Sequence, residues 1–326
     1  AFPEGALMAF DALMILGPTA SGKTALSLSI ASELPAEVIS VDSALVYRGM
    51  DIGTAKPTEA ERGGVPHHLI DIRDIGEPYN VADFTEDCVK LIPEIRSRGA
   101  LPILVGGTML YANALLHGLA ELPATDPAVR EAVTAEGEEK GWPAMREELA
   151  KVDPETAARL KPNDRQRISR AIEVYRMTGR PMSAIIAEQP HSAPPFRIAA
   201  IALLPEDRAA LHAKIAERFD AMLEAGFLDE MKRLTGLPGF DRESPAMRSV
   251  GYRQALEYLA GETDYAVFRD KAIAATRQLA KRQITWLRSM KDEIRAFDPY
   301  TESGLRDAKA YALSLDWDLR RPAARA

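Results

Sequence analysis

The stretch LGPTASGKTAL, residues 16–26, restricts the fold more than any other part of this chain. It fits the pattern G-x-x-x-x-G-K-[ST], in which glycines let backbone N–H groups turn inward around an anion at a helix N-terminus. Lys23 can reach the terminal phosphates of a ligand, and the Thr24 hydroxyl can ligate Mg²⁺. Such a match arises by chance in about one chain in a hundred of this length. The residues predicted to bind phosphate are Gly17, Pro18, Thr19, Ala20, Ser21, Gly22, Lys23 and Thr24.

An apolar run precedes this loop and a helical pattern follows it, which a chance match need not show. Further apolar runs along the chain are typical of buried parallel strands. The predicted strands cover residues 13–16, 38–41, 68–72, 101–105 and 196–203. Because helical segments alternate with the early strands, we predict an α/β fold, a P-loop NTPase-like parallel sheet with helices on both faces.

The alternation stops near residue 120. Residues 121–195 contain charged helical stretches broken by proline and glycine, and about 75 residues can pack a small core of their own. We therefore expect an α/β core formed by residues 1–120 and 196–326, with C-terminal helices after 205, and a helical insertion domain at 121–195. The tail after about residue 297 carries no pattern that we can interpret.

The second predicted strand ends at Asp42, one strand after the phosphate loop. In a doubly wound sheet both features lie at carboxyl ends of strands, where ligands bind. The carboxylate of Asp42 can serve as a base toward an acceptor nucleophile, or Asp42 and Ser43 can cap a turn. A nucleotidase usually has a carboxylate at the end of a later strand, but residues 101–105 are followed by Gly-Gly-Thr. The loop therefore does not by itself predict ATP hydrolysis.

The formal net charge of −7 argues mildly against a nucleic-acid partner, because phosphate neutralisation requires Lys and Arg. Local basic clusters oppose this average. On a helix at residues 269–290, Arg277, Lys281 and Arg288 fall on one side. The apolar residues expected on the other side are Ala272, Ala275, Leu279, Trp286 and Met290. The basic stripe is either an RNA-binding face or an ordinary solvated face.

The remaining chemistry-bearing residues are few. The single cysteine, Cys88, excludes an intrachain disulfide and a multi-cysteine zinc site, and it favours a reducing, cytoplasmic setting. No apolar run approaches the roughly 20 residues that span a bilayer. His67 and His68 are adjacent and point in divergent directions, so we interpret them as structural or substrate-lining side chains.

Seven motifs identify a family when they are taken together. They are VDSALVYRGMDIGTAKP (41–57), PHHLIDI (66–72), EPYNVADF (77–84), LPILVGGTMLYANALLHGL (101–119), PNDRQRISRAIEVYRMTG (162–179), RSVGYRQALEYL (248–259) and ATRQLAKRQITWLR (275–288). In this order, over about residues 12 to 290, they closely resemble the bacterial tRNA dimethylallyltransferases, also called tRNA isopentenyltransferases.

The resemblance implies that the loop holds the diphosphate of dimethylallyl diphosphate together with Mg²⁺. The term ATP-binding then describes only the type of fold, and no ATP is implied as a substrate. The implied acceptor is the N6 amine of the adenosine on the 3′ side of the tRNA anticodon, and diphosphate is released. The implied catalytic residues are Asp42 as general base, Lys23, Thr108 and Arg218. Sequence alone favours an ordinary solvated helix charge for Arg218, and Thr108 could merely make a turn.

The resemblance also implies a surface for the tRNA anticodon stem-loop, and we expect no membrane partner and a monomer. The residues expected to contact tRNA are Asp42, Ser43, Ala44, Leu45, Thr108, Arg130, Gln166, Arg167, Ile168, Ser169, Arg170, Arg248, Ser249, Val250, Gly251, Tyr252, Arg253, Arg277, Lys281, Arg282, Gln283 and Arg288. The target base lies in a single-stranded loop, and it must leave its stack to reach the donor.

Three other functions compete with this one. A P-loop kinase that uses Mg-ATP would explain residues 13–42 but would leave the basic helix without a role. An adenylate isopentenyltransferase acting on a free nucleotide would not need the basic clusters at 165–170 and 277–288. An RNA-binding protein without catalytic activity would not need Lys23 and Thr24.

Overall fold

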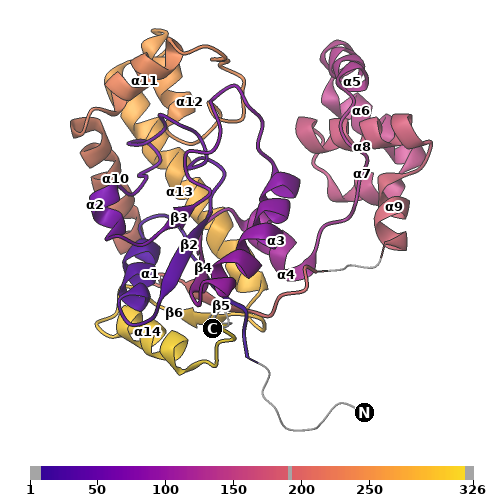
Figure 1. The fold of residues 1–326 in the computed structure, drawn as a ribbon. Helices are drawn as coiled ribbons and strands as arrows, with labels where there is room; N and C mark the ends of the chain where they lie inside the picture. Colours follow the sequence, from indigo (N-terminus) through magenta and orange to yellow (C-terminus); the bar gives the residue numbers. More distant parts are fainter. Residues whose placement is uncertain (1–8, 190–192, 320–326) are drawn as a thin grey trace, which may run out of the picture. The chain divides into compact units, whose positions relative to one another are not determined.

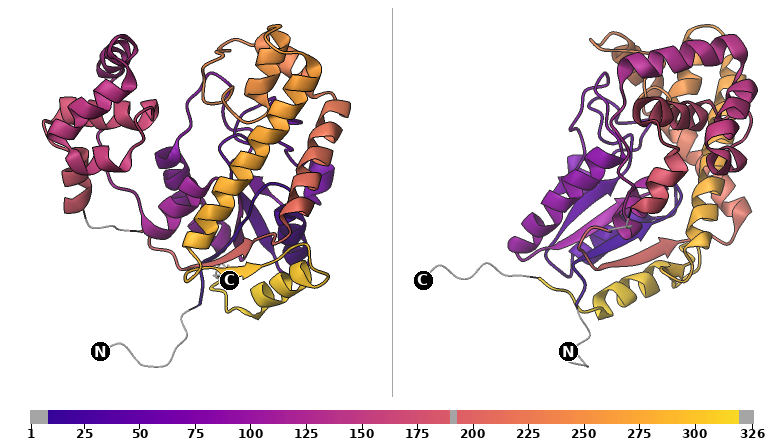
Figure 2. Two further views of the ribbon diagram at one scale, coloured as in Figure 1. Left: turned by 180° about the vertical axis from the view of Figure 1, so that it is seen from behind. Right: turned by 90° about the vertical axis from the view of Figure 1, so that its right-hand side faces the viewer.

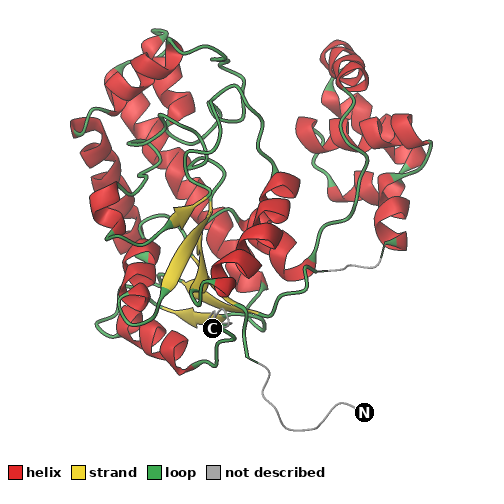
Figure 3. Cartoon of the chain, viewed as in Figure 1, coloured by secondary structure: helices red, strands yellow, loops and turns green. Residues whose placement is uncertain are grey.

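A six-stranded parallel sheet lies at the centre of the larger part of the chain (Figures 1 and 3). The computed structural model describes residues 9–189 and 193–319. The strand order is β3-β2-β4-β1-β5-β6. The strands are β1 (Ala12–Leu16), β2 (Ala36–Val41), β3 (His67–His68), β4 (Leu101–Gly106), β5 (Ile198–Leu203) and β6 (Arg295–Phe297). The predicted α/β class with a parallel sheet is confirmed.

The apolar strands form because both of their faces are buried. Alternate side chains point to opposite faces, so Leu13 packs against α1 (Lys23–Ala31) and α14 (Gly304–Ser314), whereas Met14 belongs to the larger core on the other face. That larger core includes side chains from α3 (Val81–Ser97), α4 (Met109–His117) and α13 (Tyr265–Ser289). Figure 2 shows the full length of α13 in the view from behind. The remaining helices of this part are α2 (Glu59–Arg62), α10 (Arg208–Glu224), α11 (Phe227–Thr235) and α12 (Tyr252–Leu259).

The chain divides into two compact units. One comprises residues 1–116 and 194–326, and the other comprises residues 117–193, close to the boundaries at 121 and 195 that we expect from the sequence. The second unit is helical and has its own core, which includes Val133, Met145, Leu149 and Ile168. Its helices are α5 (Pro127–Lys140), α6 (Trp142–Val152), α7 (Pro154–Arg159), α8 (Arg165–Thr178) and α9 (Met182–Glu188).

Two parts of the sheet differ from the prediction. The strand expected at residues 68–72 ends at His68, because Leu69 and Asp71 adopt left-handed backbone conformations with φ of 62° and 55° that turn the chain out of the sheet. The tail contributes an edge strand, β6, and the helix α14. Arg295 and Ala296 of β6 are exposed, so this strand has no apolar pattern by which the sequence could reveal it.

Within residues 9–189 and 193–319, no helix is both long and apolar enough to cross a bilayer. Cys88 is buried in the core next to the central sheet, and burial raises the pKa of its thiol above the usual range.

Candidate active site

The register of the sheet brings three strand ends to one edge. Leu16 of β1 and Val41 of β2 both pair with Gly106, the last residue of β4. The phosphate loop, Asp42 and Thr108 follow these three positions. They therefore lie close together at the carboxyl edge of the sheet. A Cβ atom on Gly106 would lie 2.0 Å from the Val41 carbonyl oxygen, so only glycine permits this close approach.

Short hydrogen bonds within the phosphate loop hold its shape. The Ser21 hydroxyl, which is buried, donates to the Pro18 carbonyl oxygen at 2.8 Å, and Lys23 Nζ donates to the same oxygen at 2.7 Å. Gly22 has a φ of 87°, which is the left-handed region that favours glycine. A Cβ atom on Gly17 would lie 2.6 Å from Ser21 Oγ. Both glycines of the motif are therefore required by the geometry of the loop.

Charges from three elements converge at this edge. Burial and the nearby Arg218 guanidinium lower the pKa of the Lys23 ammonium to about 8, and the Asp42 carboxylate acts in the opposite direction. Arg218 is exposed and comes from α10, far along the chain from the loop. Because Arg218 perturbs Lys23 directly, it is part of the same electrostatic site and not an isolated surface charge.

Asp42 caps a turn and still presents a free side of its carboxylate. Its Oδ1 accepts hydrogen bonds from the backbone N–H groups of Ala44 at 2.7 Å and Leu45 at 3.1 Å. Oδ2 takes no part in this turn. The Thr108 hydroxyl accepts a hydrogen bond from the Ser43 N–H at 3.1 Å. The capping role that the sequence left open is therefore realised, and it fixes the carboxylate in place beside Thr108.

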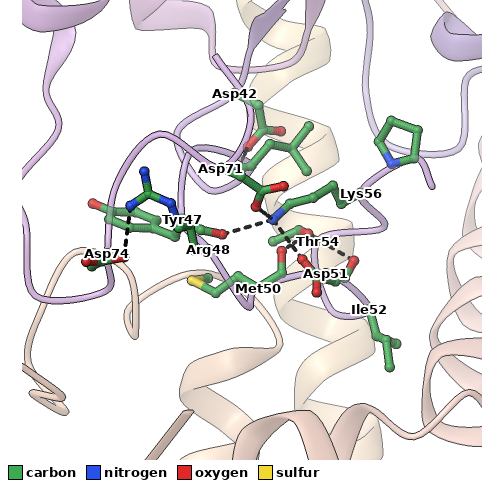
Figure 4. Close-up of polar contacts among 12 residues, drawn as sticks. Asp42, Tyr47, Arg48, Met50, Asp51, Ile52, Thr54, Lys56, Asp71 and Asp74 are labelled. Atoms are coloured by element: carbon green, nitrogen blue, oxygen red, sulfur yellow. Dashed lines mark hydrogen bonds and ion pairs between the residues drawn. The ribbon is translucent and has the colours of Figure 1, made fainter. Parts of the chain in front are cut away.

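The loop that follows Asp42 is anchored by a buried lysine (Figure 4). The Lys56 side chain is 4% exposed, and its ammonium donates to the Tyr47 carbonyl oxygen at 2.9 Å. It also forms ion pairs with Asp51 at 2.8 Å and with Asp71. Since lysine is seldom buried unless it is paired, this cluster joins the loop after β2 to the loop after β3. Sequence reasoning missed it, because Lys56 and its partners have no regular spacing.

A buried carboxylate, Glu230 of α11, also holds this loop in place. It accepts hydrogen bonds from the backbone N–H groups of Asp51, Ile52 and Gly53 at 3.1, 2.7 and 3.3 Å. The Tyr252 hydroxyl of α12 donates to Glu230 at 2.6 Å. Four donors therefore compensate the burial of one negative charge. The sequence offers no indication of this role, because an acidic residue in a helix is normally solvated.

Four residues that we expected to contact tRNA have buried side chains. Ile168 and Ser169 belong to the interior of the helical unit, and Ser169 donates to Glu173. Tyr252 is buried against Glu230, and the Gln283 amide donates to the Gly107 carbonyl oxygen at 2.8 Å. Each of these four side chains helps to hold its own unit together.

The basic residues of the helical unit lie at or near the surface in ion pairs. Arg167 pairs with Asp164 at 2.8 Å, and Arg130 lies 3.5 Å from Glu173. Arg170 is half-buried and donates to the Pro123 carbonyl oxygen. Glu173 is buried, whereas Arg167 is exposed. Exposed ion pairs contribute about 0–1 kcal/mol, so Arg167 can exchange its partner for a phosphate. Gln166 is exposed beside them.

The exposed face of α13 differs from the one expected. Arg277 is half-buried and donates to the His212 carbonyl oxygen at 3.3 Å, whereas Lys281 and Arg288 are exposed. Trp286, expected on the apolar face, is 39% exposed. The buried side of the helix carries Phe268, Ala272, Ile273, Ala280 and Leu287, and Gln283 lies among them with its amide donating to the Gly107 carbonyl oxygen. Arg282 is exposed as well, and so are Arg248, which precedes α12, and Arg253 on α12.

The two histidines are occupied by local hydrogen bonds. His68 Nε2 lies 2.7 Å from Glu37 Oε2, and His67 Nδ1 lies 2.8 Å from the Val65 carbonyl oxygen. Among the residues that the structure describes, no three His, Cys, Asp or Glu side chains are grouped as a metal site would require. These two residues hold the edge strand β3 in place.

The profile of the IPP transferase family matches residues 45–290. This chain belongs to the IPP transferase family. The resemblance inferred from the motifs is thereby confirmed. The tRNA dimethylallyltransferase of Burkholderia thailandensis is 59% identical over 283 residues, which are 86% of this chain and 87% of that protein. The enzyme of the same name from Burkholderia mallei is 58% identical over the same shares of the two chains.

Solved structures of this transferase family share the fold. The full-length tRNA isopentenylpyrophosphate transferase of Bacillus halodurans is 38% identical, with a TM-score of 0.67, over 92% of this chain and 95% of that one. A eukaryotic dimethylallyltransferase acting on tRNA is 29% identical, with a TM-score of 0.79, over 96% of this chain and 81% of that one. The phosphate loop of this chain is therefore that of a transferase.

Proposed function

We propose that this member of the IPP transferase family transfers the dimethylallyl group of dimethylallyl diphosphate to the N6 amine of the adenosine on the 3′ side of the tRNA anticodon. In this reaction the bond between the allylic carbon and the diphosphate oxygen breaks, and a bond from that carbon to N6 forms. N6 loses one proton, and diphosphate leaves. We also propose that the protein acts as a monomer in the reducing cytoplasm. Its one cysteine is buried, in keeping with that compartment.

The phosphate loop and its cations serve the leaving group. An allylic diphosphate ionises readily when the negative charge that develops on the leaving oxygens is neutralised. The backbone N–H groups of residues 19–24, the Lys23 ammonium and the Arg218 guanidinium supply this neutralisation. The lowering of the Lys23 pKa by the Arg218 guanidinium supports this role, because it brings the second cation close to the loop.

The donor set near the loop also fits Mg²⁺. This ion prefers oxygen ligands, keeps several waters, and is usually bound by one or two protein oxygens together with substrate phosphates. Thr24, at the start of α1, has an exposed side chain beside the loop and is the residue that would hold it. When bound, the ion would carry part of the charge of the departing diphosphate.

The observation that carries the proposal is the position of Asp42. Its carboxylate acts electrostatically on Lys23, and its Oδ1 is fixed by the turn while Oδ2 is left for chemistry. The N6 amine is a weak nucleophile because its lone pair is delocalised into the ring. Asp42 orients this amine and accepts its proton as general base. Thr108, whose hydroxyl accepts a hydrogen bond from the Ser43 N–H, follows β4 at the same edge of the sheet.

The exposed part of α13 contributes to tRNA binding. Lys281, Arg282 and Arg288 are exposed together with Trp286. Cations neutralise phosphates, and an exposed aromatic ring among cations offers a stacking surface for an unpaired base. The helical unit adds Arg130, Gln166, Arg167 and Arg170, and the segment before α12 adds Arg248, Ser249, Val250 and Gly251, followed by Arg253 on α12 itself.

One incubation tests the reaction and its competitors. The protein is mixed with Mg²⁺, unmodified tRNA and either dimethylallyl diphosphate labelled in its allyl group or ATP labelled in its γ-phosphate. We expect label in tRNA from the allylic donor alone. A tRNA in which guanosine replaces the target adenosine is the matched control, and it should stay unlabelled.

Other outcomes would contradict the proposal. Phosphorylation from ATP would indicate a kinase. Transfer of the allyl label to free AMP but not to tRNA would indicate a nucleotide-modifying enzyme. Binding of tRNA without any transfer would indicate an RNA-binding protein.

A further inference from the structure

A tyrosine in the C-terminal segment contacts the phosphate loop. The Tyr300 hydroxyl donates a hydrogen bond of 3.0 Å to the carbonyl oxygen of Ala20. Tyr300 lies ten residues beyond position 290, where the match to the family profile ends. No sequence pattern indicates a role for this tail, yet Tyr300 reaches the loop on which the proposed reaction depends.

The contact falls on the most constrained residue of the loop. Ala20 has a φ of 62°, in the left-handed region that residues other than glycine seldom occupy. Such a conformation persists only where the surrounding structure holds it. The hydrogen bond from Tyr300 is the contact that holds the Ala20 carbonyl group.

Holding this carbonyl oxygen fixes a donor of the cradle. The peptide bond between Ala20 and Ser21 is trans, as no cis peptide occurs in the described residues. In a trans peptide the C=O of one residue and the N–H of the next point in opposite directions. When Tyr300 keeps the Ala20 oxygen turned outward, the Ser21 N–H is kept turned toward the interior of the loop.

Tyr300 is itself fixed in position. Its backbone N–H donates to Asp298 Oδ1 at 3.0 Å, and the Lys214 ammonium of α10 lies 5.2 Å from the centre of its ring. Burial and the nearby Asp298 raise the pKa of the Tyr300 hydroxyl to about 12, so it stays a hydrogen-bond donor at neutral pH.

The segment after Tyr300 also packs against the loop. Leu305 Cδ1 lies 3.3 Å from the position that a Cβ atom on Gly22 would occupy. The turn before it is tight, because a Cβ atom on Gly304 would clash with the Asp298 carbonyl oxygen at 1.7 Å. β6 joins the turn to β5 of the sheet. The segment 298–305 therefore forms a rigid support behind the loop.

We propose that Tyr300 is a positioning residue for diphosphate binding: it orients the Ala20–Ser21 peptide and thereby aims the Ser21 N–H at the diphosphate. This inference rests on the proposed function of the loop. Tyr300 touches no substrate in this role, and it acts only through the backbone of the loop.

The test is Tyr300→Phe, which removes the hydroxyl and keeps the ring. One neutral hydrogen bond corresponds to about a 2- to 10-fold change in an equilibrium constant. Binding of inorganic diphosphate with Mg²⁺, measured by calorimetry, should weaken by this factor. The KM for dimethylallyl diphosphate should rise equally, while kcat and the KM for tRNA should change little, because the Ser21 N–H that Tyr300 aims contacts the diphosphate before and during reaction.

Tyr311→Phe is the matched control, because it removes a hydroxyl from α14, whose Tyr311 ring packs against Phe297 and Arg295. It should leave diphosphate affinity unchanged. Wild-type affinity in Tyr300→Phe, or an equal loss in both variants, would overturn the inference. If the wild-type protein binds diphosphate but transfers no allyl group, the proposed reaction is wrong. In that case, weaker diphosphate binding by Tyr300→Phe would still support the positioning role.

Discussion

The Tyr252 hydroxyl donates a 2.6 Å hydrogen bond to Glu230, a carboxylate with 1% of its surface exposed. The same carboxylate receives three backbone N–H groups from residues 51–53. These residues belong to the loop that begins at the proposed general base, Asp42. Helices α11 and α12 therefore hold a loop that carries part of the active site, although neither helix contributes a reacting group.

Tyr252→Phe should destabilise the protein by about 1.5–3 kcal/mol, the usual contribution of a hydrogen bond to a charged group. The loss arises because Glu230 stays buried with one donor fewer. Urea unfolding monitored by circular dichroism measures it. Tyr265→Phe removes the hydroxyl of a ring that is 47% exposed and should leave the midpoint unchanged. Identical midpoints for the two variants would show that the Tyr252 contact contributes nothing.

Lys23→Ala should lower the transfer rate by about 10² to 10³, as expected when one donor to a developing negative charge is removed. The Lys23 ammonium lies at the loop and its hydrogen bond to Pro18 is internal to it, so tRNA affinity should stay near the wild-type value. Single-turnover kinetics with saturating tRNA separates the two effects. Normal turnover in this variant would refute the assignment of the loop.

The pKa of Lys23, near 8 in the protein without ligand, predicts a pH dependence. Below this pH the side chain is an ammonium that attracts diphosphate, and above it the side chain is a neutral amine. The value of kcat/KM for dimethylallyl diphosphate reports groups of the free enzyme, so it should fall as the pH rises through about 8.

Lys23→Arg tests this assignment, because arginine stays protonated over the whole range. Its absolute rate should be lower, since the guanidinium has a different shape, but the decline near pH 8 should disappear. A decline that persists unchanged in this variant would assign the titration to another group.

Asp42→Asn should slow the chemical step by about 10² or more while tRNA binding stays largely intact, within the range of general-base catalysis. The amide oxygen of asparagine can still accept the N–H groups of Ala44 and Leu45, so the turn should survive. Rapid-quench single turnovers measure the step directly. If tRNA affinity collapses while single-turnover chemistry is normal, Asp42 binds tRNA and is not the base.

The exposed cations of α13 should govern the salt dependence of tRNA binding. Changing Lys281, Arg282 and Arg288 together to Gln should flatten the plot of log affinity against log salt by about two units, at about 0.7 per phosphate contact on single strands. Binding of dimethylallyl diphosphate should change little, and glutamine preserves the helix.

The control for this triple variant changes net charge equally at other helices. Lys90, Lys232 and Arg306 are exposed on α3, α11 and α14, and replacing them with Gln should leave the salt slope unchanged. Equal slopes for wild type and the α13 variant would mean that α13 presents only a solvated face, and the tRNA contacts would then have to lie at Arg165–Arg170 and Arg248–Arg253.

Local patterns in the sequence determined four strands of the sheet and the phosphate loop. Short apolar runs define β1, β2, β4 and β5, because a strand buried on both faces needs a continuous apolar stretch. The phosphate loop follows from residue identity, since its glycines and Lys23 are needed within eight consecutive positions. The family resemblance implied Asp42, Thr108 and Arg218, because no spacing in the sequence joins these three residues.

Tertiary structure alone decided which side chains support the site. Glu230 reaches residues 51–53 across 177 to 179 positions, and Tyr300 reaches Ala20 across 280 positions. The buried side of α13 includes Gln283, whose amide donates to the Gly107 carbonyl oxygen, whereas Trp286 is exposed. A local pattern records only the preference of a side chain for water or for a core, whereas these contacts depend on which polar groups the folded sheet and its helices bring together.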